Sequence, residues 1–199
     1  MAVRRANGGL LALSLMLGGC AAIPGFGPAP VDVYDLTAPV AQVPRRLPRT
    51  QILVPEPTAL KILDGEDIAI RTPGGAVQLL EGARWSDRLP RLVQSGLVAA
   101  YQHSGALGGV GRPGDGLAID YQIIVEIRGF EVRPGGGQAV VELFVRVLND
   151  RNGQVRASRS FFATASLAGA RSDPAFVAAL DRAFQAVAAE IVEWSIGVM

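Results

Sequence analysis

The chain has 199 residues, 49% of them hydrophobic, which is enough apolar material for one folded domain of ordinary size. Its 19 basic and 18 acidic residues nearly cancel. The sequence therefore lacks the clustered positive charge that nucleic-acid binding requires, and we expect no nucleic-acid partner. It contains one histidine and one cysteine, so a metal site built from several nitrogen or sulfur ligands is excluded.

The first twenty residues have the pattern of an export signal. Arg4 and Arg5 precede an apolar run over residues 10–17, and two glycines then lead to the only cysteine, Cys20. A secretory signal typically has a positively charged N-terminal region, a short apolar region and small residues before its cleavage site. The run is shorter than the roughly 20 apolar residues that span a bilayer. The order Leu-Gly-Gly-Cys resembles the bacterial lipobox.

The lipobox resemblance implies that residues 1–19 are a cleaved lipoprotein signal peptide. It also implies that Cys20 carries a covalent diacylglycerol and an N-acyl lipid, such as palmitate, and we expect no other cofactor. Ala21 follows the cysteine where aspartate would imply retention at the inner membrane, so the resemblance implies a lipid anchor in the outer membrane, facing the periplasm. The alternative is that Cys20 is an ordinary small residue of a disposable signal.

Residues 20–30 are rich in proline and glycine, which favours a tether because such a segment can hold neither a helix nor a strand ladder. Residues 31–199 are then predicted to form a single α+β domain. After removal of the signal's two arginines, 19 − 2 = 17 basic residues face 18 acidic ones, so the mature protein is nearly neutral.

The first half of the domain predicts short strands and one helix. Alternating apolar residues predict strands over 31–36 and 51–54, and a hairpin over 67–80 with a turn at Pro73–Gly75. Apolar residues at helical spacing follow Ser86, which is predicted to be the N-cap, with Asp87 in the first turn. Gly105 is expected to end this helix.

The second half predicts a three-stranded antiparallel meander followed by a long helix. Period-two apolar stripes run over 117–127, 139–147 and 155–167, and the last two are joined by an Asn-Gly turn at 152–153. Asp173 is predicted to be the N-cap of a helix that reaches about Trp194, with Pro174 at its first position. The fold class is therefore α+β, a mixed or antiparallel sheet with two helices packed on one face.

Several apolar residues of the meander point away from these stripes. They are Ile124, Val140, Phe144, Leu148 and Phe162. A solvated sheet face should be polar there, so something is expected to cover them. Two alternatives stay open, namely the protein's own residues 31–80, and a partner or sister subunit that contacts Phe144 and Phe162.

The chain resembles the ABC-type transport auxiliary lipoproteins, the PqiC-like family. The resemblance rests on the lipobox cysteine, on Tyr34–Leu36, on Ile52–Pro55 and on Arg84–Pro90, together with the meander and the C-terminal helix. It implies an auxiliary component of an ABC-type lipid transporter that contains an MCE-domain protein. The family brings no catalytic residues, so the resemblance implies that the protein is not an enzyme and acts by tethering and docking.

Other motifs give little support to catalysis. Residues 109–114 fit G-x-G-x-x-G, but the motif is expected to lie in a loop after a helix, where a dinucleotide site needs a strand before it. His103 is the only histidine and is placed at a helix end. Asp115, Asp120 and Glu126 could form a hydrolase-type carboxylate pair only if the fold brought two of them together.

Two aromatic residues have both a structural and a functional interpretation. Trp85 precedes the first helix, where it can pack the helix onto the core or contact a partner, and Tyr34 has the same two alternatives. The predicted function is auxiliary lipid transport, with a homo-oligomer left open. The alternatives are an outer-membrane assembly or scaffold lipoprotein and a small envelope hydrolase.

Overall fold

A computed structural model of the chain describes residues 30–199. Cys20, the signal peptide and most of the tether lie outside the described residues. The elements are, in chain order, β1 (Asp32–Tyr34), β2 (Leu47–Leu53), β3 (Thr58–Ala59), the 3-10 helix η1 (Lys61–Leu63), β4 (Asp67–Arg71), β5 (Val77–Trp85), α1 (Leu89–Ser104), β6 (Leu107–Gly111), β7 (Tyr121–Arg133), the 3-10 helix η2 (Pro134–Gly136), β8 (Gln138–Asn149), β9 (Gln154–Ser166) and α2 (Asp173–Val198).

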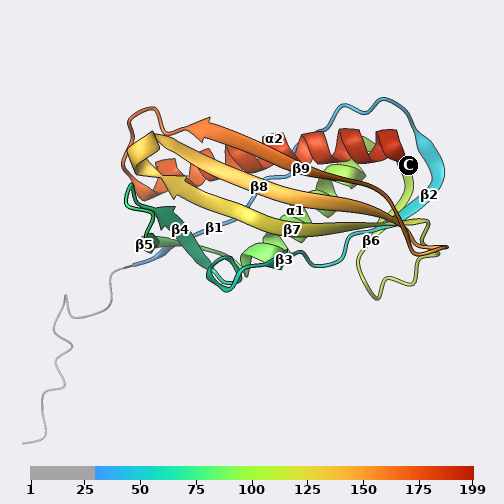
Figure 1. The fold of residues 1–199 in the computed structure, drawn as a ribbon, viewed down its shortest axis with the longest axis horizontal. Helices are drawn as coiled ribbons and strands as arrows, with labels where there is room; N and C mark the ends of the chain where they lie inside the picture. Colours follow the sequence, from blue (N-terminus) through green and yellow to red (C-terminus); the bar gives the residue numbers. More distant parts are fainter. Residues whose placement is uncertain (1–29) are drawn as a thin grey trace, which may run out of the picture.

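Strand β7 is the centre of a nine-stranded mixed sheet (Figure 1). On one side it pairs antiparallel with β8 along its whole length, and β8 pairs with β9, which confirms the predicted meander. On the other side β2, β3 and β4 pair in parallel with its beginning, middle and end. Beyond these strands, β6 pairs with β2, β5 with β4, and β1 with β5.

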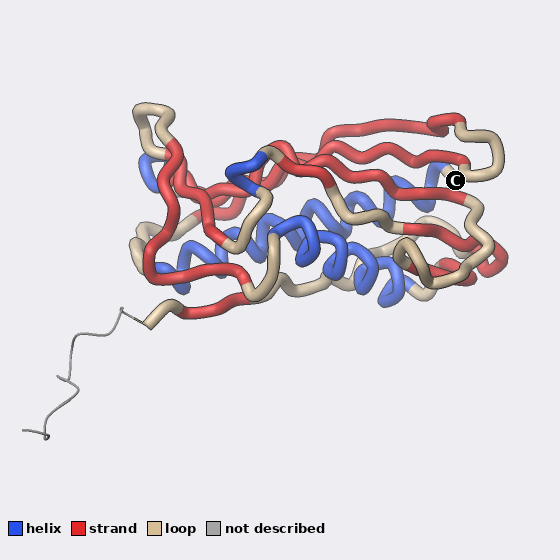
Figure 2. Tube along the Cα trace, turned by 90° about the horizontal axis from the view of Figure 1, so that it is seen from below, coloured by secondary structure: helices blue, strands red, loops and turns tan. Residues whose placement is uncertain are grey.

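The core lies between the sheet and the two helices, which run side by side on one face of the sheet, α2 against the meander and α1 beside β6 (Figure 2). Alternate residues of β7 point into it, beginning with Ile123 and Val125. A bulge between Ile127 and Gly129 shifts this alternation by one residue, so Phe130 also faces inward. The predicted α+β class, with two helices packed on one face, is confirmed.

Both helices begin at positions other than those predicted. Helix α1 is capped by Arg88 and starts at Leu89, because the Ser86 hydroxyl donates to Asp35 and leaves the helix end. Helix α2 is capped by Ser172, which makes Asp173 the first helical residue. Gly105 ends α1 in a left-handed conformation, φ 58°, as predicted.

The glycine-rich segment after α1 is a strand where the sequence predicts a loop. Residues 107–111 form β6, which pairs in parallel with β2. Its glycines allow an unusually close approach, since a Cβ at Gly108 would lie 2.4 Å from the carbonyl oxygen of Pro48. The first predicted stripe of the meander, expected over 117–127, forms a strand only from Tyr121, because residues 112–120 form the connection between β6 and β7.

The face of the meander opposite the helices is left uncovered by residues 31–80 at Phe162, although Arg71 reaches Glu131 on the same face. Those residues form strands that extend the sheet along the edge of β7, and they do not lie over its face. Phe162 is 57% exposed on this face. Val140 is buried there, and Ile124, Phe144 and Leu148 are partly buried. For Phe162, coverage by the protein's own first half is therefore wrong, and coverage by a partner stays a prediction.

Gly96 sets how closely the two helices pack. A Cβ at this position would lie 2.6 Å from Cζ of Phe184, which is fully buried and cannot move aside. We expect Gly96→Ala to lower the free energy of unfolding by about 1–3 kcal/mol through overpacking, although alanine favours helices more than glycine. Urea denaturation measures this change.

Gly197→Ala in α2 is the matched control, because its Cβ would meet nothing within 4 Å. We expect that variant to be unchanged or more stable by less than about 1 kcal/mol. Equal stability of the two variants would contradict the close approach of the helices at Gly96.

Candidate functional site

The segment before α1, which carries the family resemblance, is held in place by backbone hydrogen bonds to two distant parts of the chain. The N–H of Trp85 donates to the carbonyl of Glu66 at 2.7 Å, and the N–H of Ser86 donates to the carbonyl of Tyr34 at 2.8 Å. The N–H of Leu89 donates to the carbonyl of Gly65 at 2.8 Å. Leu89 is the first residue of α1, so its long-range bond takes the role that a side-chain cap would have, while the other two bonds fix the chain that leads into the helix.

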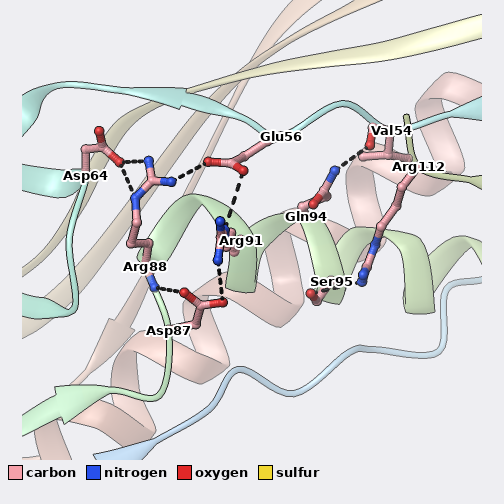
Figure 3. Close-up of polar contacts among 9 residues, drawn as sticks. All are labelled: Val54, Glu56, Asp64, Asp87, Arg88, Arg91, Gln94, Ser95 and Arg112. Atoms are coloured by element: carbon pink, nitrogen blue, oxygen red, sulfur yellow. Dashed lines mark hydrogen bonds and ion pairs between the residues drawn. The ribbon is translucent and has the colours of Figure 1, made fainter. Parts of the chain in front are cut away.

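Arg88 is the centre of an ion-pair cluster at this end of α1 (Figure 3). Its Nη1 lies 2.8 Å from Oε1 of Glu56, and its Nε donates to Oδ1 of Asp64 at 3.1 Å. Arg91, one turn further, lies 3.7 Å from the other oxygen of Glu56 and 3.6 Å from Asp87. The cluster joins α1 to the chain on both sides of β3.

The same side of α1 holds the chain at the end of β2 and the loop after β6. The amide of Gln94 donates to the carbonyl of Val54 at 2.9 Å in a buried contact, and Arg112 donates to the hydroxyl of Ser95 at 3.0 Å (Figure 3). A buried polar side chain that is fully bonded in this way fixes the position of its partner. The polar groups of α1 therefore serve to position the neighbouring chain.

Two small grooves meet beside β3. One has a volume of about 330 Å³ and is lined by Thr58–Leu60 and Glu126–Arg128. The other, of about 310 Å³, is lined by Glu56–Ala59 with Asp64 and Arg88. Their charged residues already pair with one another within the protein, as Arg88 does with Asp64 and Arg128 with Glu126. A polar ligand at these grooves would have to compete with those pairs.

The four aromatic candidates for partner contact lie in different surroundings. Trp85 is 1% exposed and packs edge-on against Phe130 at 5.7 Å between ring centroids, in accordance with the structural alternative. Tyr34 is partly exposed on β1. Phe144 lies under the guanidinium of Arg128, 4.1 Å from its ring centre, and Phe162 is the most exposed of the four. The sheet brings only Phe144 and Phe162 onto one face.

The carboxylates considered for hydrolysis each bind a different structural partner. Asp115 accepts from the N–H of Arg112, and Glu126 pairs with Arg128. Asp120 accepts from the N–H of Gln51 at 2.9 Å and lies 2.5 Å from Arg151. The backbone bond from Gln51, aided by Arg151, holds the pKa of Asp120 below its ordinary value. A general acid needs the opposite shift.

His103 and the glycine motif over residues 109–114 also lack the surroundings of a catalytic or cofactor site. His103 lies in the last turn of α1 and is exposed. The glycine motif begins inside β6 and does not precede a helix, so it lacks the geometry of a dinucleotide site. Within residues 30–199 no group of three or more metal-ligating side chains comes together.

With this geometry in hand, comparison with known proteins identifies the family. Residues 34–192 match the family described as "ABC-type transport auxiliary lipoprotein component". The chain belongs to this family. The match covers every described strand and helix from the end of β1 to most of α2.

Individual relatives agree with the family assignment. The chain is 30% identical over 174 residues to an uncharacterized protein of Bradyrhizobium diazoefficiens, covering 86% of this chain and 47% of that one. It therefore spans about half the length of the curated relative it matches. A crystal structure of a Xanthomonas campestris protein of family DUF330 superposes with a TM-score of 0.77 at 27% identity, covering 84% of this chain and 96% of that one.

A second crystal structure, of an uncharacterized protein, supports the fold. It superposes with a TM-score of 0.66 at 17% identity and covers 82% of this chain and 97% of that one. Both solved structures therefore share the overall fold of this chain. None of the described helices of this chain has both the length and the apolar character needed to cross a membrane.

One notable charged group was missed by the sequence reasoning. Glu131 on β7 is 3% exposed, and its Oε1 accepts from Nε of Arg71 at 2.7 Å and from Nε of Arg133 at 2.8 Å. Burial alone would raise the pKa of Glu131, but the two guanidinium groups outweigh it and hold the pKa below its ordinary value. Arg71 is 60 residues away in the chain, so no local spacing indicates the pair.

The Glu131 pair is expected to make stability depend on pH. A carboxyl whose pKa is lowered by folding stabilises the protein above its unfolded-state pKa, and this contribution disappears as pH falls through the folded-state pKa. We expect Glu131→Gln to cost about 2 kcal/mol of unfolding free energy at pH 7, because it removes charged hydrogen bonds. The difference from the unmodified chain should shrink as pH falls below about 4. Urea denaturation at several pH values measures it.

Glu142→Gln is a matched control on the adjacent strand, because Glu142 forms no ion pair with the residues that the structure describes. Its effect should be small and independent of pH. A Glu131→Gln penalty that stays constant down to pH 3 would contradict ionisation of Glu131 in the folded protein.

Proposed function

We propose that the protein is a lipid-anchored envelope component that assists an ABC-type lipid transporter by docking onto its MCE-domain protein. The observation that carries this proposal is the match to the transport auxiliary lipoproteins over residues 34–192. The lipobox-like sequence ending at Cys20 supports an anchor, and Ala21 favours the outer membrane with the domain facing the periplasm. Two or more acyl chains would hold the domain stably, whereas one chain binds only marginally.

The described domain supports action by contact. Its conspicuous charged groups, Arg88 and Glu131, bind partners within the fold and hold its elements together. Phe162 is an exposed apolar residue of the meander, and it gives a second protein an apolar contact point on this face. A scaffold or assembly role is the second candidate, because the same exposed face would serve it equally well.

Lipidation is tested by feeding cells radiolabelled palmitate. We expect the chain to take up label and to lose its first 19 residues, because the thiol of Cys20 accepts the diacylglycerol before cleavage. Cys20→Ala should remain unlabelled and uncleaved, and Ser14→Ala within the same apolar run should behave as the unmodified chain. Uptake of label by Cys20→Ala, or its absence from the unmodified chain, would contradict the anchor.

The transport role is tested by crosslinking the intact cell envelope and identifying what is attached to the protein. We expect an MCE-domain protein among the products, and its yield should fall when Phe162 is replaced by serine, which removes exposed apolar area at the meander surface. Val40→Ser is the control, because Val40 is also exposed but lies outside the meander. Recovery of outer-membrane assembly factors alone would favour the scaffold role.

A further inference from the structure

Strand β5 has an edge that no strand within residues 30–199 pairs with over most of its length. β4 pairs with one side of β5, and β1 pairs on the other side only with Ala83–Trp85. Among residues 30–199 no strand lies beside Val77–Gly82 on the β1 side. β1, β4 and β5 lie together at one end of the molecule, opposite β2 and β6 (Figure 1).

The direction of the backbone groups on this edge follows from the β4–β5 hairpin. The N–H of Thr72 donates to the carbonyl of Ala76 at 2.9 Å, so these two residues form a hydrogen-bonded pair. Alternation then makes Ile70 and Gln78, which are opposite each other, the next such pair. The N–H and C=O groups of Val77 and Leu79 therefore point away from β4, toward the unpaired edge.

The sequence gives a chemical reason for the short ladder between β1 and β5. Because the N–H of Ser86 donates to the carbonyl of Tyr34, the backbone groups of Tyr34 face β5, and so do those of Asp32 by alternation. The next residue in that series is Pro30, which has no N–H to donate. The proline therefore interrupts the ladder, and the part of the chain that the structure describes leaves the edge open beyond it.

A groove of about 950 Å³ runs along the same edge. It is lined by Gln78–Gly82 and by Asp173 at the start of α2. The charged residues that line it, Glu81 and Asp173, are both acidic. Asp173 reaches the strand because Gly82 has no side chain, since a Cβ there would clash with the carboxylate oxygen of Asp173. Leu79, 43% exposed, adds an apolar contact.

We propose that the open edge of β5 binds an extended, positively charged segment of a partner protein, which adds to the sheet as a further strand. The backbone groups of Val77 and Leu79 would bond to the added strand, while Glu81 and Asp173 would pair with its lysine or arginine side chains. A second copy of this chain is disfavoured, because pairing two β5 edges would bring like acidic charges together. The partner class rests on the proposed function, in which the domain acts by docking.

Peptide binding to the full chain, purified in detergent, tests this proposal without a transporter or a membrane. The probe is an eight-residue peptide of alternating valine and lysine, and its counterpart replaces lysine with glutamate. We expect the lysine peptide at about 1 mM to slow amide hydrogen exchange in residues 77–82 by about tenfold. The glutamate peptide should leave exchange unchanged, and added salt should weaken the lysine peptide's effect.

Two variants separate the backbone contribution from the charge. Leu79→Pro removes an N–H that points to the open edge, and Glu81→Lys reverses a groove charge, and each should weaken binding about tenfold. Leu60→Pro is the control for the first, because exposed Leu60 has φ −64°, which proline accepts. Glu193→Lys, an exposed position on α2, is the control for the second. Thermal melting identifies any variant that has lost its fold.

Three outcomes would overturn the proposal. They are the absence of protection in residues 77–82 at about 1 mM lysine peptide, equal binding of both peptides, and binding that Glu81→Lys leaves intact. Protection of residues 77–82 that rises with protein concentration alone would instead assign the edge to a second copy. None of these results determines the outcome of the palmitate or crosslinking experiments. The proposed binding site on β5 can therefore be contradicted while the proposed function stands, and the reverse also holds.

Discussion

The fold depends on one constraint, which is that β7 is hydrogen-bonded along both of its edges. The meander occupies one edge without interruption, while β2, β3 and β4 share the other in three short stretches. The chain from residue 47 to 71 must therefore follow β7 from beginning to end. This path brings Glu56 and Asp64 beside the start of α1, where Arg88 binds both of them. The family-like segment before α1 is thus fixed by contacts that exist only when the N-terminal half has paired with β7.

The sequence predicted the parts of the fold that depend on regular patterns. The stripes over 139–147 and 155–167 gave β8 and β9, and the spacing after Pro90 gave α1, because one buried face imposes a period on the residues. The β4–β5 hairpin followed from its glycine turn. Helix starts were misplaced by one or two residues: the Ser86 hydroxyl bonds to Asp35 and α1 begins beyond it, while α2 begins one residue before the predicted position.

The remaining features depend on distant contacts that leave no local signal. β6 has no apolar stripe, because its glycines serve a close approach to the chain at Pro48. The ion pair of Arg71 with Glu131, and that of Arg88 with Glu56, join residues 60 and 32 positions apart. The candidate aromatic residues were separable only by burial, since Trp85 and Phe162 both sit in apolar patterns but one lies in the core and the other at the surface.

The sheet's other long edge shows why the edge of β5 is selective. β9 presents thirteen residues at the side of the meander, and such an edge invites pairing with other chains. Here Arg159 occupies an inward-facing position beside the edge and pairs with Glu190 of α2, while Arg156 donates to the carbonyl of Val198. These charged contacts tie the edge strand to the helix and disfavour an added strand.

At β5 the charges are arranged differently. Glu81 and Asp173 line the groove without cancelling charges among its lining residues, and the backbone groups of Leu79 remain directed outward. Like charges on adjacent strands destabilise the pairing of the strands, and opposite charges stabilise it. An acidic edge therefore repels a second copy of itself and other acidic strands, and it attracts a basic strand. The same carboxylates can therefore protect the edge from self-association and select the segment that binds there.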